Sequence, residues 1–251
     1  MTWLEALALF GAGIAAGGIN TTVGSGTLIT FPTLLAVGYP PVLANVSNTV
    51  GLVPGSVSGA IGYRRELTGQ RERLIRLGLP SLLGGITGAL LLLKLPESAF
   101  NAIVPVLIGL GCILVLAQPW ISQRVKPPVE APPHGSVWVW VLVYAAGIYG
   151  GYFGAAQGVL LIAILGLGLA ESLQRINATK NVLAGLVNAV AALVFILVTD
   201  VAWAAAGIIA AGSIIGGQLG ATVGRRLPPP VLRGFVAVVG LVAIINLVFL
   251  D

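Results

Sequence analysis

Two short clusters of small and polar residues, one in each half of the chain, hold the side chains best suited to chemistry. The first contains Gly24, Ser25 and Gly26, and the second contains Gln157 and Gly158. Glycine permits backbone conformations that other residues resist, while serine and glutamine offer spare hydrogen-bond donors. Because each cluster interrupts an apolar stretch, we predict that a helix breaks at both points and leaves polar groups free there.

A second polar motif follows each break. It reads Asn45-Val46-Ser47-Asn48 in the first half and Asn177-Ala178-Thr179-Lys180 in the second. Residues i and i+3 share a helix face, so the two outer residues of each motif project together. Asparagines often join helices in a bilayer, and Lys180 could extend its ammonium to the interface. The alternative is that Lys180 is a fixed cation that attracts an anionic substrate.

The apolar segments after the breaks, residues 27–37 and 159–169, are too short to cross a bilayer. As helices they would each span about 16 Å, roughly half of the hydrocarbon core. Their N-termini would carry free N–H groups and a partial positive charge, and two such ends that approach from opposite sides form an anion site. The simpler interpretation is that the glycines only allow close helix packing. The predicted substrate-binding residues are Gly24, Ser25, Gly26, Asn45, Ser47, Asn48, Gln157, Gly158, Asn177, Thr179 and Lys180.

The elements that would position these residues repeat along the chain. Asn177 follows Asn45 by 132 positions, and the same offset pairs Gly26 with Gly158 and Leu95-Pro96 with Leu227-Pro228. With 57% hydrophobic and 8% charged residues, the chain is far more apolar than soluble domains, which carry about 25% charged residues. We predict ten apolar helices, at residues 3–19, 27–37, 42–61, 74–93, 98–120, 137–153, 159–169, 176–197, 201–223 and 231–250.

The flanking charges change sides between the halves. The basic loop from Arg64 to Arg76 corresponds to the turn at Thr199-Asp200, and the turn from Lys94 to Glu97 corresponds to a basic one. Such alternation predicts an all-α polytopic membrane protein with two inverted repeats, residues 1–120 and 137–251, each with a broken or re-entrant helix. A Pro-rich cytoplasmic linker, residues 121–136, joins them. Both termini would lie outside, which leaves these basic residues inside: Arg64, Arg65, Arg71, Arg73, Arg76, Arg124, Lys126, Arg175, Arg225, Arg226 and Arg233.

Several classes of protein are disfavoured. The net charge of +5 is confined to short loops, so it favours topology and contact with the lipid bilayer over nucleic-acid binding. An enzyme would need a nucleophile with a base, or clustered metal ligands, whereas His134 lies in the linker and Cys112 in an apolar run. We therefore expect no catalytic residue, metal or cofactor. The repeated Gly-xxx-Gly pairs at residues 84–88 and 216–220 indicate close helix contact, within the chain or in a homodimer.

The first break and its motif resemble a known family. Residues 24–35, Gly-Ser-Gly-Thr-Leu-Ile-Thr-Phe-Pro-Thr-Leu-Leu, followed by Gly38 and by Ala44-Asn45-Val46-Ser47-Asn48, are similar to the TauE/SafE family of sulfite and organosulfonate exporters. Gly158 and residues 177–180 fit the repeated pattern of that family. Its members usually have a richer glycine run in the first break, which Ser25 interrupts here.

The resemblance implies an inner-membrane permease of bacteria that exports a small sulfur-containing anion, such as sulfite or sulfoacetate. The residues themselves agree on the sign of the cargo, since donors and a lysine suit an anion. We expect a carrier that works by alternating access, with the anion held at the midplane between the half-helix N-termini. The alternatives are an anion channel, which can use the same dipoles, and an importer of another small organic anion.

Overall fold

The computed structural model describes residues 1–124, 132–223, 234, 238 and 241. Within these residues every regular element is helical, in agreement with the predicted fold class. The helices of the described ranges are α1 (Trp3–Thr22), α2 (Thr27–Ala36), α3 (Pro41–Gly62), α4 (Arg71–Lys94), α5 (Glu97–Arg124), α6 (Val137–Tyr152), α7 (Gln157–Gly168), α8 (Leu173–Val198) and α9 (Trp203–Thr222). The predicted segment 231–250 lies almost wholly outside the described residues, as do Lys126, Arg225, Arg226 and Arg233.

Five of these helices, α1, α4, α5, α8 and α9, are long and apolar enough to cross a membrane. Large hydrophobic side chains such as Leu79, Val106 and Leu197 are more than half exposed on the outer surface. Polar side chains instead lie inside, and α3 buries Asn45, Ser47 and Asn48. The outer surface of a membrane protein faces lipid, so apolar side chains lie outside and polar ones are buried, the reverse of a water-soluble protein. The pattern seen here is the one expected of a multi-pass membrane protein.

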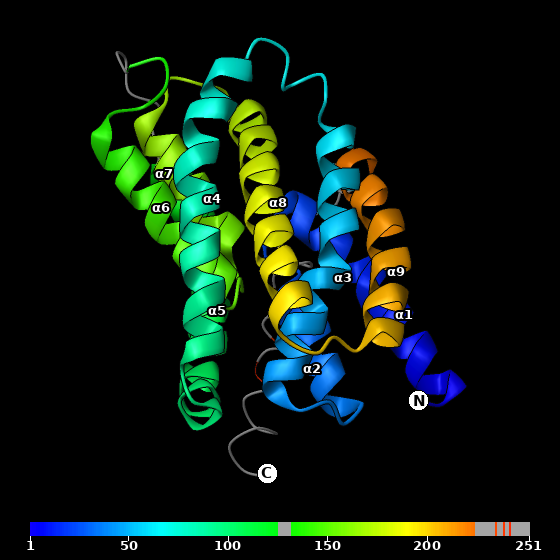
Figure 1. Ribbon diagram of the computed structural model, residues 1–251. Coiled ribbons are helices and arrows are strands. Elements are labelled where there is room, and N and C mark those ends of the chain that lie inside the picture. The colour runs from blue at the N-terminus through cyan, green and yellow to red at the C-terminus, as the bar shows by residue number, and fades with distance from the viewer. Residues whose placement is uncertain (125–131, 224–233, 235–237, 239–240, 242–251) are drawn as a thin grey trace.

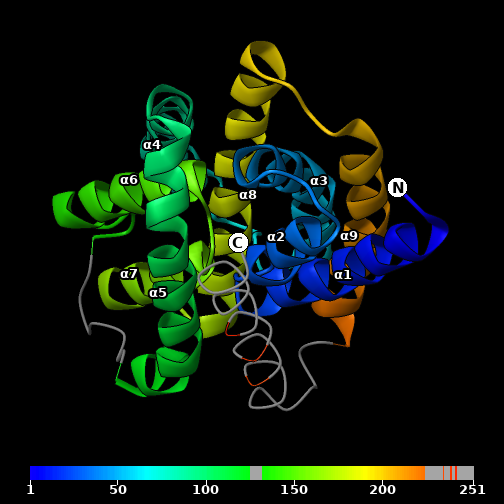
Figure 2. The same cartoon turned by 90° about the horizontal axis from the view of Figure 1, so that it is seen from below.

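The two sequence halves exchange helices. Helix α1 of the first half packs along α9 of the second, and α6 of the second half packs along α4 of the first (Figure 1). A β-carbon on Gly88 would lie 2.1 Å from the carbonyl oxygen of Ile148, and one on Gly216 would lie 2.0 Å from that of Ile14. The two Gly-xxx-Gly motifs therefore bring helices together within the chain. Helices α3 and α8 contact each other near the centre of the bundle (Figure 2).

The broken helices enter the bundle from opposite ends. In Figure 1 α1 begins at the lower end of the molecule and α6 at the upper end. The short helices that follow them lie at opposite ends as well, with α2 at the lower end and α7 at the upper end. Two inverted halves would place their broken helices in this way, and the inversion itself stays a prediction.

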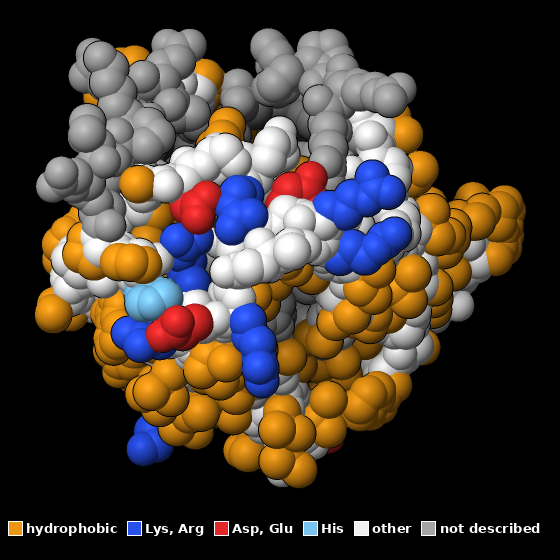
Figure 3. Space-filling model, turned by 90° about the horizontal axis from the view of Figure 1, so that it is seen from above, with side chains coloured by type: hydrophobic (Ala, Val, Ile, Leu, Met, Phe, Trp, Pro, Cys, Tyr) orange, Lys and Arg blue, Asp and Glu red, His pale blue; other side chains and the backbone are white. Residues whose placement is uncertain are grey.

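Charge is distributed unevenly between the two ends of the molecule. Arginines gather with a few acidic residues at the upper end, which Figure 3 shows from above. Glu97 and Asp200 lie together at the other end, where both line a cavity with Leu95. The arginine-rich upper end is therefore the end that the positive-inside rule predicts to face the cytoplasm.

Both breaks are shorter than the sequence suggests. The first was expected to begin at Asn20, but α1 continues to Thr22, and the hydroxyls of Thr21 and Thr22 donate to the carbonyls of Gly17 and Gly18. The second break ends earlier than expected, since α7 begins at Gln157. The irregular segments that remain are residues 23–26 and 153–156.

Other helix ends also differ from the predicted ones. Helix α4 begins at Arg71 and α8 at Leu173, three residues before the first apolar residue of each predicted segment. Helix α5 runs to Arg124, four residues into the predicted linker. Polar and basic residues are good helix formers, so each helix continues beyond its apolar part into the interfacial region.

Candidate functional site

The two breaks meet in the structure. The carbonyl oxygen of Gly24 accepts a hydrogen bond of 3.0 Å from the backbone N–H of Gly158. A β-carbon on either glycine would lie 2.4 Å from the α-carbon of the other, so only glycine allows the approach. Gly24 also has a φ of +89°, in the left-handed region that glycine adopts without strain. Two segments far apart in the sequence thus form one backbone contact inside the bundle.

The end of α1 is capped by α8. The ammonium of Lys180 donates to the carbonyl oxygens of Asn20 at 3.0 Å and Thr21 at 3.2 Å. Asn177 and Asn181 each donate from Nδ2 to the same Thr21 oxygen, both at 3.2 Å. The last carbonyls of a helix lack internal partners and carry partial negative charge, so a cation and two amides stabilise this interrupted end.

Asn45 caps the other broken helix in the same way. Its Nδ2 donates to the carbonyl oxygen of Tyr152, the last residue of α6, at 2.9 Å. The first-half asparagine therefore binds the second-half broken helix, and Asn177 binds the first-half one. Both asparagines join helices, as one of the two interpretations of the sequence proposed.

Asn48 holds the short helix α2 rather than a helix end. Its Oδ1 accepts from the hydroxyl of Thr30, and its Nδ2 donates to Thr27 Oγ1 at 3.3 Å. Thr27, Thr30 and Asn181 were not among the predicted substrate-binding residues. The spacing of three between the two threonines, which places them on one face of α2, was a signal that could have identified them.

Ser47 and Thr179 lie away from the breaks. Ser47 Oγ accepts from the backbone N–H of Ala202, just before α9 begins, at 2.9 Å. Thr179 Oγ1 donates to the Gln70 side chain, just before α4, at 3.0 Å. The structure does not bring these two residues together with the other predicted site residues, and each secures the start of a neighbouring helix.

Ser25 and Gln157 occupy equivalent positions in the two breaks and keep free donors. Ser25 Oγ and Gln157 Nε2 are both buried and make no hydrogen bond to any residue that the structure describes. Within the same part of the chain, the backbone N–H groups of Ser25, Gly26 and Thr27 at the start of α2 also lack an acceptor. Buried donors are costly unless they are hydrogen-bonded, so both breaks offer donors that an acceptor could engage.

Lys180 lies beside the second break. Its side chain is 1% exposed, and its Cδ would lie 3.0 Å from a β-carbon on Gly158. The ammonium is therefore buried beside the break, and the interpretation that it extends to the membrane interface is wrong. No salt bridge to Lys180 is formed by the described residues. Two carbonyls occupy two of its three N–H donors, and the third has no acceptor among the described residues.

A polar network links the loops of the two halves. Glu171, between α7 and α8, binds Arg73 at 2.8 Å and Arg175 at 2.7 Å. Burial raises the pKa of the Glu171 carboxyl, but hydrogen bonds and positive charge from the two arginines lower it more, so the net shift is downward. Arg175 also donates to the carbonyl of Thr68 at 3.1 Å. The network joins the α3–α4 loop of the first half to the second half.

The chain was compared with known proteins. The family model described as sulfite exporter TauE/SafE matches residues 9–247. A probable membrane transporter protein, YfcA, of Escherichia coli K12 is 25% identical over 249 residues, which cover 96% of this chain and 88% of the relative. No solved structure matches.

Two further relatives carry similar names. A probable membrane transporter protein of Haemophilus influenzae is 26% identical over 230 residues, which cover 89% of this chain and 88% of the relative. The probable membrane transporter protein ORF9 of Sinorhizobium is 26% identical over 243 residues, covering 95% of this chain and 90% of the relative. The matched residues include both breaks and both asparagine motifs. The chain belongs to the sulfite exporter TauE/SafE family and is a membrane transporter rather than an enzyme.

Proposed function

We propose that the protein exports a small sulfur-containing anion, such as sulfite or sulfoacetate, across the bacterial inner membrane, with both termini outside. The observation that carries the proposal is the pair of unpartnered buried donors, Ser25 Oγ and Gln157 Nε2, at equivalent positions in the two breaks. An oxyanion has several acceptor oxygens, so it would accept hydrogen bonds from these two donors and from the third N–H of Lys180.

The backbone strengthens the preference for an anion. The free N–H groups at the start of α2 and the N-terminus of α7 carry partial positive charge, as at other anion sites on helix N-termini. Asn45 Oδ1 and Asn177 Oδ1 are also buried and have no hydrogen-bond partner among the described residues. These two acceptors would bind a protonated ligand oxygen or a water molecule that accompanies the anion.

Release of the anion requires movement. Ser25 and Gln157 are 0% and 3% exposed, so the site is closed to both sides of the membrane. Each broken helix packs on a helix of the opposite half, α1 on α9 and α6 on α4. Rocking of the α1–α9 pair against the α4–α6 pair would open the site alternately to each side. A membrane potential that is negative inside favours outward movement of one negative charge by about 2.3 kcal/mol per 100 mV. Export would therefore need no coupling ion.

The test is a flux measurement in proteoliposomes with sulfite, sulfoacetate, sulfate and carboxylate analogues, with and without an imposed potential. We expect saturable transport and counterflow for a sulfur oxyanion, with the potential accelerating export. Currents that do not saturate would identify a channel instead. Transport of carboxylates alone would contradict the proposed cargo.

A matched pair of serine variants locates the site. Ser25→Ala should reduce the apparent affinity for the transported anion about tenfold, because a hydrogen bond to a charged group contributes about 1.5–3 kcal/mol. Ser81, in α4, is also buried and unpartnered but lies outside both breaks. Ser81→Ala should leave the affinity unchanged. Equal effects of the two substitutions would move the site away from the breaks.

A further inference from the structure

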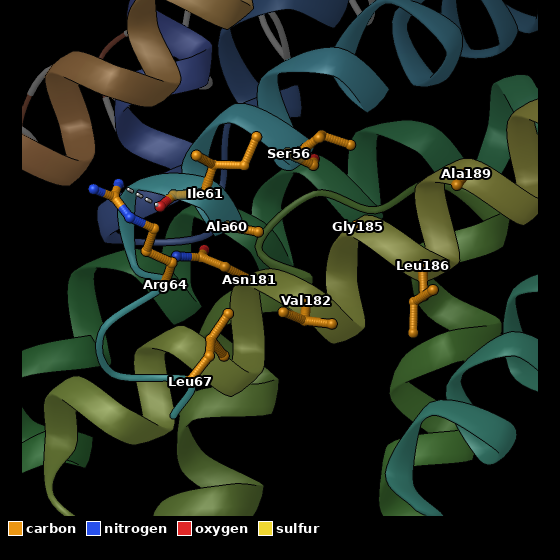
Figure 4. A pocket seen from close by; sticks show the side chains of 11 residues that line it. Ser56, Ala60, Ile61, Arg64, Leu67, Asn181, Val182, Gly185, Leu186 and Ala189 are labelled. Atoms are coloured by element: carbon orange, nitrogen blue, oxygen red, sulfur yellow. Dashed lines mark hydrogen bonds between the residues drawn. The ribbon is translucent and has the colours of Figure 1, made fainter. Parts of the chain in front are cut away.

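A groove runs along α8 on the outside of the bundle, at the basic end. Two adjoining cavities form it, one of about 390 Å³ between α3 and α8 and one of about 760 Å³ between α4 and α8. They share Leu67, Val182 and Leu186. Figure 4 shows the first cavity, with Ser56, Ala60 and Ile61 on the α3 side and Val182, Gly185 and Ala189 on α8.

The walls of the groove are apolar and continue the lipid-facing surface. Val57 and Ile61 on the α3 side are 54% and 52% exposed, and Ile75 and Leu79 on the α4 side are 63% and 60% exposed. Asn181 is a polar lining residue, but its amide nitrogen is engaged by the Thr21 carbonyl. Such walls suit a hydrocarbon chain and offer little to the small anion of the proposed transport site.

Cations line the same groove at the cytoplasmic end. Arg64 borders the first cavity, and Arg71 and Arg76 border the second. Arg76 pairs with Glu72, whereas the acidic residues in the described ranges leave Arg64 and Arg71 without an ion pair. Arg64, in the turn after α3, donates a long hydrogen bond of 3.4 Å to the carbonyl of Ile61 (Figure 4). By contrast, Arg73 and Arg175 already share Glu171.

We propose that this groove binds one anionic phospholipid of the cytoplasmic leaflet. Its phosphate would lie between Arg64 and Arg71, and an acyl chain would lie on Val182, Leu186 and Ala189. The charge pattern favours this occupant. An anionic lipid carries a net negative charge that would pair with Arg64 and Arg71 while its acyl chains contact the apolar wall, whereas a zwitterionic lipid has no net charge to pair with them. Clusters of Arg at the cytoplasmic end of membrane helices attract anionic lipid in general.

The lipid would also contact the framework of the transport site. Asn181 lines the groove and at the same time donates to the Thr21 carbonyl at the end of α1. A bound acyl chain would thus support α8 in the position from which it caps the broken helix. The proposal concerns a separate ligand and does not depend on the identity of the transported anion.

The test is native mass spectrometry of the detergent-purified chain titrated with phosphatidylglycerol, with phosphatidylcholine of the same acyl chains as reference. We expect the wild-type protein to retain one phosphatidylglycerol in preference to phosphatidylcholine. Arg64→Gln should reduce the apparent affinity for phosphatidylglycerol about fivefold, the effect of one basic residue near an anionic lipid. Arg65→Gln removes the same charge from an exposed neighbour that does not line either cavity, and should leave the affinity within about twofold.

A second pair of variants tests the acyl chain. Ala189 is exposed on the groove, so Ala189→Phe fills it without disturbing the core, and it should abolish preferential retention. Ala204→Phe, at an exposed position of α9, should not. The proposal is overturned if Arg64→Gln and Arg65→Gln act equally or if Ala189→Phe leaves retention intact. It is also overturned if the spectra show a dimer that Ala189→Phe dissociates, since a second copy would then cover the groove.

Discussion

Asn45 and Asn177 lie 132 positions apart and perform the same task in opposite halves: each donates its amide N–H to the carbonyl end of the other half's broken helix. The bonds measure 2.9 Å to Tyr152 and 3.2 Å to Thr21. Neither half caps its own broken helix, because the capping asparagine comes from the other half of the chain. The breaks are thus a joint property of the two repeats, and this explains why both carry an asparagine at the same position.

Lys180 differs from the asparagines because it adds a charge to the α1 cap. We predict that Lys180→Ala weakens binding of the transported anion at least tenfold, since a hydrogen bond to a charged group contributes about 1.5–3 kcal/mol. Anion-dependent stabilisation in a thermal-shift titration measures this affinity. Asn181→Ala is the control, because it removes a bond to the same Thr21 carbonyl without removing charge. If both variants lose affinity equally, Lys180 acts only as a cap.

The close helix contacts inside the chain make another prediction. Gly88→Val should destabilise the protein by about 3 kcal/mol, because the new β-carbon would lie 2.1 Å from the Ile148 carbonyl oxygen, in the contact between α4 and α6. Gly207→Val, at a glycine of α9 with open space around it, should be nearly neutral. The measurement is the melting temperature of each of the two variants in detergent. A normal melting temperature for Gly88→Val, combined with loss of a dimer, would instead place the Gly-xxx-Gly motif between subunits.

Local sequence patterns predicted the breaks and the partnership of equivalent residues well. The offset of 132 identified Ser25 with Gln157 and Asn45 with Asn177 before any coordinates, because a repeat must place equivalent residues in equivalent surroundings. The helix ends were less predictable. Helix α1 runs on through the polar residues Thr21 and Thr22, which apolar periodicity does not reveal.

The direction of each polar side chain was harder to predict. Ser47 follows Asn45 by two residues, which turns it by about 200° around the helix and away from the breaks. Which neighbour it meets there, the start of α9, depends on packing between helices that are distant in the sequence. The orientation of Lys180 has the same origin. Its place four residues into the predicted segment 176–197 suggested the interface, but α8 begins at Leu173 and the buried ammonium donates to the carbonyls of Asn20 and Thr21.

That network predicts a dependence of stability on acid. In the folded protein the pKa of Glu171 lies below its ordinary value of 4.5. The charged carboxylate therefore stabilises the fold above pH 4.5, and this stabilisation is lost as the pH falls through the lower pKa of the folded state. Glu171→Gln should lower stability by about 2 kcal/mol at pH 7. Melting temperatures of the variant and the wild type should converge well below pH 4.5.

The control for this prediction is the more exposed pair Arg76–Glu72. Its glutamate side chain is 63% exposed, so Glu72→Gln should change stability at pH 7 by less than about 1 kcal/mol. A difference between Glu171→Gln and the wild type that persists unchanged into acid would show that packing, rather than charge, accounts for the effect.

The contact between Gly24 and Gly158 is the most demanding feature of the site, and it yields the last prediction. Gly24→Ala places a β-carbon 2.4 Å from the Gly158 α-carbon, so the two breaks must separate. We expect transport to fall below about a tenth of the wild-type rate, with destabilisation of about 3 kcal/mol from overpacking. Gly38→Ala separates this effect from backbone strain, because Gly38 has a similar φ of +93° but open space around it. The Gly38 variant should lose about 1–2 kcal/mol of stability and keep its transport rate in proteoliposomes. Equal loss of transport in both variants would mean that left-handed backbone strain, and not the meeting of the two breaks, limits function.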